Sequence, residues 1–229
     1  MTMNTTRTSP VQDQFADLNP QWDVVRGMRM AVRLAGDEAA ARDAVAIADL
    51  SCLDRAGIKG PEAARWLESL HLPVPAQANA WTELPGGGVI ARLGRTEFFL
   101  EDGVTGDLAS RVQDVPARGI AGVYPVIRQD AAIAVVGARV NELLVQTCNV
   151  NFQELDSASR TVVMTMMAGV AVLVIRQDHQ NFPGFRIWCD ATYAPYLWET
   201  LAGIASELGG RPIGAGGLLS QTATGVTKS

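Results

Sequence analysis

The residue types that most often carry chemistry are sparse in this chain of 229 residues. It has two histidines, His71 and His179, and three widely spaced cysteines, Cys52, Cys148 and Cys189. A zinc site needs three or four converging ligands, and neither histidine stands at ligand spacing from a cysteine. No G-x-S-x-G elbow and no close Cys–His pair occurs, so the sequence gives no support for nucleophilic catalysis.

Carboxylates and tryptophans are the remaining candidates for a ligand cleft. Some carboxylates could meet in a cleft, although a solvated surface explains them better: Glu97, Glu101, Asp102, Asp178 and Asp190. The tryptophans favour core and subdomain-interface positions, although one or two could line a cavity for a flat heterocycle. They are Trp22, Trp66, Trp81, Trp188 and Trp198.

Three glycine-rich positions do not predict nucleotide binding. Gly86 to Gly88 and Gly214 to Gly217 do not fit the phosphate-loop pattern G-x-x-x-x-G-K-[ST]. Gly137 follows an apolar run and precedes a helical one, but it is a single glycine rather than G-x-G-x-x-G.

The stretch that organises the chain is residues 36–70, GDEAAARDAVAIADLSCLDRAGIKGPEAARWLESL. Asp37 is a good N-cap for a helix from Glu38 to about Val45. Short strands over 47–50 and 56–59 should flank a turn. Gly60-Pro61 should then open a helix, because proline at the first helical position has no donor to lose.

The second half of the chain repeats this design. IAVVG-ARVNELLVQT, which contains Gly137, echoes AGIKG-PEAARWLESL, which contains Gly60. Both read as a strand, a glycine and a helix, where the glycine allows close helix–strand packing or a positive φ. Residues 22–34 should form one strand, and a helix should run from Asp190 to Leu208.

Strands and helices mix without regular βαβ alternation, which predicts an α+β protein with antiparallel sheets. We expect a flexible tail over 1–20, a first subdomain over 21–118, a second over 119–217 and a flexible tail over 218–229.

Composition excludes some partners. The net charge is −5 and no basic run occurs, which argues against nucleic acid or a membrane as partner. No apolar run reaches membrane-spanning length, and the N-terminus lacks the apolar core of a signal peptide. Three unpaired cysteines suit a reducing compartment, so we expect a cytoplasmic protein.

Residues 36–70 resemble the opening segment of the aminomethyltransferase, or T-protein, of the glycine cleavage system. That segment reads E-H-x-A-x-R-x-x-x-G-x-x-D-L-S, then a strand, G-P-D-A and a helix. The matching residues are Glu38, Arg42, Asp49, Leu50, Ser51, Gly60, Pro61 and Ala63. RLGRTEFFLEDG resembles the family's R-L-G-x-x-E-F-L-L hairpin, and GFRIWC resembles its G-F-E-I-Y-V strand.

The chain departs from the T-protein at two functional positions. The family's N-x-x-G-G-I-x-D-D stretch carries an aspartate where folate and the aminomethyl group meet, whereas Gly87 to Arg92 contains none. The family's G-Y-T-G-E glutamate contacts the pterin, whereas Asp178 to Gly184 contains no glutamate. The chain also stops where the T-protein would continue into its last barrel domain. Cys148 lies in QTCNVNF, which does not match the K-G-C-Y-x-G-Q motif of the related iron–sulfur maintenance proteins.

A shorter relative is more similar, the gamma subunit of heterotetrameric sarcosine oxidase. Its second half often reads G-P-x-A-x-x-x-L-x-x-x-C-x-x-D-L, followed by a strand pair and a helix with L-W-x-W-L. Residues of this chain echo that pattern: Gly137, Leu143, Leu144, Cys148, Leu197, Trp198 and Leu201.

The resemblance implies a T-protein-like folate-binding fold, α+β, with two related antiparallel-sheet and helix subdomains and without the C-terminal barrel. It implies a non-catalytic, gamma-like subunit of a complex that oxidatively demethylates a methylated amine such as sarcosine. That complex would be linked to tetrahydrofolate one-carbon transfer. Larger oxidoreductase subunits would be the partners and would hold the flavin, with no cofactor in this chain.

Two alternatives remain open, a free-standing tetrahydrofolate-binding aminomethyl- or methyltransferase and a scaffold whose ligand cleft has decayed. If tetrahydrofolate binds this chain, the resemblance points first to the residues on or beside the family's cleft segments. These are Glu97, Phe99, His179 and Phe182.

Overall fold

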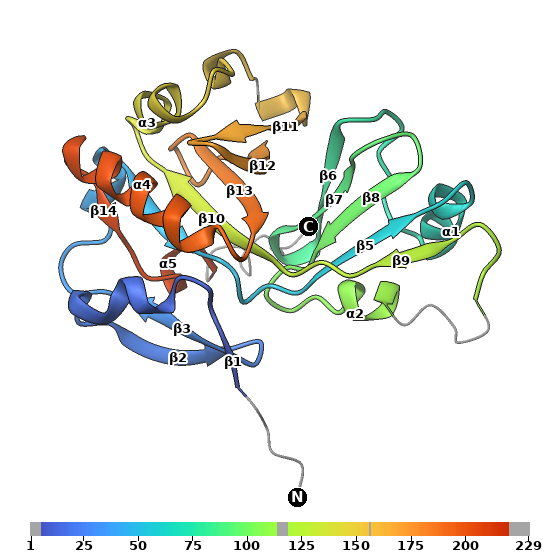
Figure 1. The fold of residues 1–229 in the computed structure, drawn as a ribbon, viewed down its shortest axis with the longest axis horizontal. Coiled ribbons are helices and arrows are strands. Elements are labelled where there is room, and N and C mark those ends of the chain that lie inside the picture. Colours follow the sequence, from blue (N-terminus) through green and yellow to red (C-terminus); the bar gives the residue numbers. More distant parts are fainter. Residues whose placement is uncertain (1–5, 114–118, 156, 220–229) are drawn as a thin grey trace, which may run out of the picture. The chain divides into compact units, whose positions relative to one another are not determined.

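The computed structural model describes residues 6–113, 119–155 and 157–219, which form two compact units. The described part of unit 1 comprises residues 6–52, 130–155, 157 and 164–219. The described part of unit 2 comprises residues 53–113, 119–129 and 158–163. Both units combine open sheets with helices, so the predicted α+β class is confirmed (Figure 1). The predicted subdomain boundaries at 21–118 and 119–217 stay a prediction.

Unit 1 contains a six-stranded sheet in the order β11-β12-β13-β10-β4-β14. Its strands are β4 (Ala46–Asp49), β10 (Asp130–Val136), β11 (Val162–Met167), β12 (Val170–Arg176), β13 (Gly184–Asp190) and β14 (Arg211–Pro212). β10 pairs antiparallel with β13 and β4, whereas β14 runs parallel to β4. Six of the seven residues of β10 are buried, as expected for a central strand with both faces covered.

Unit 2 contains a five-stranded antiparallel sheet in the order β6-β7-β8-β5-β9. Its strands are β5 (Arg55–Lys59), β6 (Ala80–Leu84), β7 (Gly88–Arg92), β8 (Glu97–Glu101) and β9 (Tyr124–Val126). Ile58, Phe98 and Leu100 lie on the face that packs with Ala63 and Leu67 of α1 (Ala63–Ser69). Ala109 of α2 (Leu108–Gln113) belongs to the same core, so one face of the sheet carries both helices.

The two large sheets repeat one topology with one strand exchanged. In unit 2 the chain runs β5, α1, β6, β7, β8, and in unit 1 it runs β10, α3 (Val140–Thr147), β11, β12, β13. The strand that lies beside the first strand of each repeat comes from the other half of the chain. β4 directly precedes β5 in the sequence but pairs with β10. β9 precedes β10 but pairs with β5. The repeat read from sequence is therefore a repeat of fold, although neither sheet is built from one continuous half.

The glycine that ends the first strand of each repeat has the same role. Gly60 has φ +126°, and a Cβ added there would collide with the Gly122 carbonyl oxygen. Gly137 has φ +153°, and a Cβ there would collide likewise with the Ala44 carbonyl oxygen. Both requirements, a positive φ and a close backbone approach, are met only by glycine.

Residues 6–20 are not the flexible tail that the sequence suggested. β1 (Arg7–Thr8) pairs parallel to β3 (Met28–Arg33), which pairs antiparallel with β2 (Gln21–Val25). The 3-10 helix η1 (Gln12–Leu18) buries Phe15, whose ring centroid lies 5.0 Å from that of Trp198. Burying such a side chain stabilises the fold by about 1.5–3 kcal/mol, which is one of the contributions that offset the cost of ordering this segment. The tail predicted for residues 1–5 lies outside the described residues.

Two further elements differ from the sequence prediction. Residues 22–34 form a hairpin rather than one strand, because Arg26 and Gly27 both have positive φ and turn the chain between β2 and β3. The helix expected from Glu38 to Val45 is only a short 3-10 helix, η2 (Ala40–Asp43). Its N-cap residue is Ala39 rather than the predicted Asp37, although Asp37 Oδ1 accepts hydrogen bonds from the backbone N–H groups of Ala39 and Ala40 in the turn before it.

The remaining helices follow the predicted pattern more closely. α4 (Ala194–Glu207) buries Leu197, Trp198 and Leu201 along one stripe. The other helices are α5 (Gly216–Leu219) and the 3-10 helices η3 (Pro85–Gly87), η4 (Phe152–Glu154) and η5 (Ser157–Ser159). Leu218 and Leu219 are buried, so the described start of the predicted C-terminal tail is part of the fold. Residues 220–229 lie outside the described residues.

Candidate functional site

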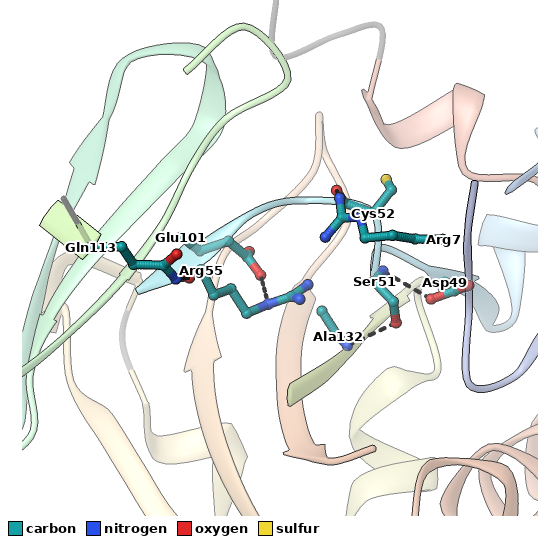
Figure 2. Close-up of polar contacts among 8 residues, drawn as sticks. All are labelled: Arg7, Asp49, Ser51, Cys52, Arg55, Glu101, Gln113 and Ala132. Carbon is teal, nitrogen blue, oxygen red and sulfur yellow. Dashed lines mark hydrogen bonds and ion pairs between the residues drawn. The ribbon is translucent and has the colours of Figure 1, made fainter. Parts of the chain in front are cut away.

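The Asp49-Leu50-Ser51 motif forms a buried turn at the end of β4 in unit 1 (Figure 2). Asp49 Oδ2 accepts a 2.5 Å hydrogen bond from Ser9 Oγ, and Oδ1 accepts one of 2.9 Å from the Ser51 N–H. Ser51 Oγ accepts a 3.1 Å bond from the Ala132 N–H of β10. The side chains of the motif therefore connect the end of β4 to Ser9 and to β10, which is a structural role.

A second polar cluster in unit 1 brings Arg42 of η2 to the turn that precedes β13. His179 and Phe182 exchange two backbone hydrogen bonds across this turn, and Gln180 between them has φ +56°. Arg42 Nη1 donates a 3.2 Å hydrogen bond to Gln180 Oε1. The cluster thus joins the 36–70 stretch to the segment that replaces the T-protein's G-Y-T-G-E.

Two buried nitrogens in this cluster have no hydrogen-bond partner among the described residues. They are Nε of Arg42, a residue that is only 8% exposed, and Nε2 of His179. Burial lowers the pKa of His179, and the positive charge of Arg42 lowers this pKa further. His179 is therefore neutral near pH 7, and Arg42 is the main positive charge of the cluster.

Glu38 lies near this cluster but does not form an ion pair with Arg42 in the part of the chain that the structure describes. In a continuous α-helix the two residues, four apart, would be neighbours on one face. The helix is too short for that, and Glu38 Oε1 instead accepts hydrogen bonds from the Leu34 N–H at 2.6 Å and the Gly214 N–H at 2.8 Å.

In unit 2, the sheet face opposite the helices carries aromatic side chains and cations. Strand register places one residue from each strand in a row across this face: Trp81, Ala91, Phe99, Gly57 and Val126. The guanidinium carbon of Arg160 lies 4.3 Å from the Trp81 ring centroid, and that of Arg128 lies 5.1 Å from the Phe99 centroid. Trp81 Nε1 is buried and has no partner among the described residues.

Gly57 makes room for one of these cations. A Cβ added to Gly57 would lie 3.3 Å from Arg128 Cδ and 2.9 Å from Val126 Cβ. Because Gly57 has no side chain, Arg128 can cross the sheet and reach the Phe99 ring. Cations over aromatic faces are a favourable electrostatic arrangement, which also presents positive charge along this row.

An ion pair occupies the next row of the same face. Arg55 Nε donates to Glu101 Oε2 at 2.6 Å, and the Arg55 carbonyl oxygen accepts a 2.7 Å bond from Gln113 Nε2 (Figure 2). Glu101 is fully buried and Arg55 is 6% exposed. The positive charge of Arg55 and the negative charge of Glu101 therefore compensate each other inside unit 2.

The predicted folate-site residues fall into two separate pairs. Glu97 is exposed at the start of β8, and Phe99 is buried two residues later in the row under Arg128. His179 and Phe182 are half-buried and bracket the turn beside Arg42 in unit 1. Their role as a folate site stays a prediction.

The carboxylates named above as candidates for a shared cleft have separate partners. Glu101 pairs with Arg55, and Asp102 Oδ1 accepts from the Ala109 N–H. Asp178 pairs with Arg176 at 2.9 Å. Asp190 is exposed, and hydrogen bonds from the side chain and backbone of Thr192 lower its pKa.

Metal-type ligands do not gather in the described part of the chain, where no three His, Cys, Asp or Glu side chains converge. Cys52, Cys148 and Cys189 are buried thiols that form no disulfide bond. Among the described helices, none has the length and apolar character needed to cross a membrane.

Sequence reasoning missed Arg42, Trp81, Arg128 and Arg160 as site residues. Arg42 is one of the residues that match the family motif, which was the available signal for it. Trp81 is one of five tryptophans, and the sequence gives no reason to prefer it over the other four. Arg128 and Arg160 carry no local signal, because strand register and a neighbouring glycine bring them to the aromatic rings.

Comparison with known proteins confirms the resemblance. The family model of the GCVT N-terminal domain matches residues 13–222. Curated relatives include the aminomethyltransferases of Saccharopolyspora erythraea and Parafrankia sp., each 27% identical to this chain over 93% of its length. The Thermotoga maritima aminomethyltransferase is 25% identical over 77% of the chain. The chain spans 62% of the first two relatives and 52% of the third.

Two solved structures share the fold. The aminomethyltransferase T of the glycine cleavage system from Bartonella henselae superposes with a TM-score of 0.72 at 15% identity, covering 96% of this chain and 61% of that one. A chain of heterotetrameric sarcosine oxidase from Corynebacterium sp. U-96 superposes with a TM-score of 0.65 at 18% identity, covering 89% of this chain and 97% of that one. With the family model matched over most of its length, the chain belongs to the GCVT N-terminal domain family.

Proposed function

We propose that this chain is an accessory subunit, without catalysis of its own, of a hetero-oligomeric oxidoreductase. The complex would oxidatively demethylate a methylated amine such as sarcosine and pass the one-carbon unit toward tetrahydrofolate. The flavin would lie on larger partner subunits. Three buried cysteines that form no disulfide bond suit a reducing compartment, so we place the complex in the cytoplasm.

A likeness of fold supports this proposal. The fold spans 97% of the matching sarcosine oxidase chain but only 61% of the Bartonella aminomethyltransferase. A chain of heterotetrameric sarcosine oxidase is thus matched nearly from end to end, whereas the aminomethyltransferase has further structure beyond the match. The chain therefore shares its fold with nearly the whole of one chain of a hetero-oligomeric oxidase.

The observation that carries the proposal is the state of the two segments in which the T-protein has functional carboxylates. The run that replaces the T-protein's aspartate lies mostly in β7, where Val89, Ile90 and Ala91 are fully buried. In the turn that replaces the G-Y-T-G-E glutamate, the carboxylate is that of Asp178, which pairs with Arg176 and also accepts from the Gly184 N–H. Neither segment offers a carboxylate free to act as a base.

Affinity purification of the tagged chain from its native host tests the proposal. We expect larger subunits in fixed stoichiometry, a flavin absorption spectrum in the purified material, and bleaching of that spectrum by sarcosine or another methylated amine. A monomer that turns over an aminomethyl or methyl donor by itself would contradict the proposal.

Two glycine variants serve as matched controls for this purification. Gly203→Ala alters an open position of α4, with no atom near its Cβ, and should recover the full complex. Gly137→Ala forces a Cβ against the Ala44 carbonyl oxygen and should recover much less, because it destabilises unit 1. Equal recovery with both would mean that the captured proteins do not recognise the folded chain.

The aromatic row of unit 2 favours a second candidate, a free-standing tetrahydrofolate-binding transferase. Flat heterocycles bind beside aromatic rings, and Trp81 Nε1 is a buried donor that lacks a partner among the described residues. Arg128 and Arg160 supply positive charge for the carboxylates of folate. The residues present therefore fit this ligand chemically.

Equilibrium dialysis with tetrahydrofolate separates the two candidates. Saturable binding that Trp81→Phe weakens about tenfold, by removing one buried donor, would favour the transferase. Trp66→Phe is the matched control, since Trp66 packs against the core on the opposite face of the sheet. If tetrahydrofolate does not bind and no partner co-purifies, the third alternative, a scaffold with a decayed cleft, is favoured.

A further inference from the structure

Two groups of opposite charge lie beside Gly217 in unit 1. A Cβ placed on Gly217 would be 3.4 Å from Arg42 Nη2 and 3.9 Å from Glu38 Oε2. Neither atom has a hydrogen-bond partner among the described residues, and neither is among the polar atoms closed off from solvent. A donor and an acceptor therefore stand close enough for one small group to contact both.

The two side chains are held in place by other contacts. Glu38 is fixed through Oε1, which accepts hydrogen bonds from the Leu34 and Gly214 N–H groups. Arg42 is fixed through Nη1, which donates to Gln180, and by burial of all but 8% of its surface. These contacts do not use Arg42 Nη2 or Glu38 Oε2. The two side chains are therefore held in position while these two atoms remain available for hydrogen bonds to a ligand.

The charges of this site sum to zero. Arg42 contributes one positive charge, Glu38 one negative charge, and His179 is neutral near pH 7 because burial lowers its pKa. An anion would be attracted by Arg42 but repelled by Glu38. A cation would be attracted by Glu38 but repelled by Arg42. A ligand without net charge that carries an acceptor next to a donor satisfies both groups.

We infer that Arg42 and Glu38 bind a primary carboxamide group. Its oxygen accepts a hydrogen bond from Arg42 Nη2, and its N–H donates to Glu38 Oε2. A zwitterion would also balance the charges, but removing two full charges from water costs more than removing an amide. This site lies wholly within unit 1 and shares no residue with the aromatic row of unit 2.

NMR of the two histidines provides a direct assay in the full chain. His179 lies beside Arg42, whereas His71 is exposed in unit 2 and serves as an internal control. Acetamide, acetate and acetone have nearly the same shape but differ in their donors, acceptors and charge. We expect acetamide to shift the His179 ring signals saturably and His71 not at all. Acetate and acetone should bind at least about tenfold more weakly, since each loses one charge-assisted hydrogen bond.

A charge variant tests the assigned roles more sharply. In Glu38→Gln the amide oxygen can still accept from the Leu34 and Gly214 N–H groups, but an NH2 group replaces Oε2. The site then offers two donors and a net positive charge, so the preference should switch from acetamide to acetate. A merely structural Glu38 would not produce this switch.

Gly217→Leu should block the site, because its side chain would fill the space between Nη2 and Oε2. Gly203→Leu, at an open position of α4, should bind acetamide as the wild type does. The inference is overturned if acetate or glycine binds the wild type as tightly as acetamide. It is equally overturned if no probe moves His179 in a protein whose two histidine signals remain dispersed.

Discussion

Arg55 and Glu101 face each other across β5 and β8, with Arg55 Nε 2.6 Å from Glu101 Oε2 and both side chains almost fully buried. Removing one partner of such a pair leaves an uncompensated charge in the interior. We therefore expect Glu101→Leu to lower the free energy of unfolding by about 3–5 kcal/mol. Urea denaturation followed by circular dichroism measures this loss.

The double variant Arg55→Met with Glu101→Leu is the control for that experiment. It removes both charges together, so most of the loss should be recovered. If the double variant is as unstable as Glu101→Leu, packing rather than charge determines the stability of this row.

Gly60 and Gly137 should be equally intolerant of a side chain. Each has a positive φ, and a Cβ at either would collide with a backbone carbonyl oxygen. We expect Gly60→Ala and Gly137→Ala each to cost about 3 kcal/mol or more, combining backbone strain with overpacking. Thermal unfolding measures both, and Gly203→Ala should instead be neutral or stabilising by up to about 1 kcal/mol.

Asp49 should contribute stability rather than ligand affinity. Its two oxygens accept hydrogen bonds from Ser9 Oγ and from the Ser51 N–H, and it is only 3% exposed. Asp49→Ala would leave both donors without this acceptor, at a cost of about 2–3 kcal/mol. Ser9→Ala removes one donor and should cost less. A stable Asp49→Ala protein that fails to bind tetrahydrofolate or partner subunits would argue for a functional carboxylate instead.

His179 should make stability depend on pH in the acidic range. Burial and the charge of Arg42 hold its pKa in the folded state below the ordinary value of 6.5. As the pH falls below about 6.5, the unfolded chain takes up a proton that the folded chain resists. The free energy of unfolding should therefore be constant above this pH and decrease below it.

Comparing wild type with His179→Gln between pH 7.5 and 5.5 isolates this contribution. The variant should lose less stability on acidification, whereas His71→Gln should follow the wild type. A steeper loss in His179→Gln would show that the folded state favours the protonated imidazole.

The sequence by itself determined the local units of this protein. Gly60-Pro61 predicted a helix start, and α1 begins two residues after Pro61, at Ala63; Asp37 predicted the turn that precedes η2, and Gly137 the second strand–glycine–helix unit. These signals succeed because they act within a few residues, through a preset φ, a missing side chain or a short hydrogen bond. They also carried the resemblance that the family model confirms.

Only the tertiary structure decided which strands complete each sheet and which polar groups meet. β4 and β9 pair with distant strands rather than with the nearest ones, since register depends on contacts that no local pattern encodes. The same holds for Arg42: a helix over 38–45 would have paired it with Glu38, but Glu38 instead accepts hydrogen bonds from Leu34 and Gly214. The local pattern fixes which residues are near in the chain, and long-range backbone contacts decide which of them remain available to a ligand.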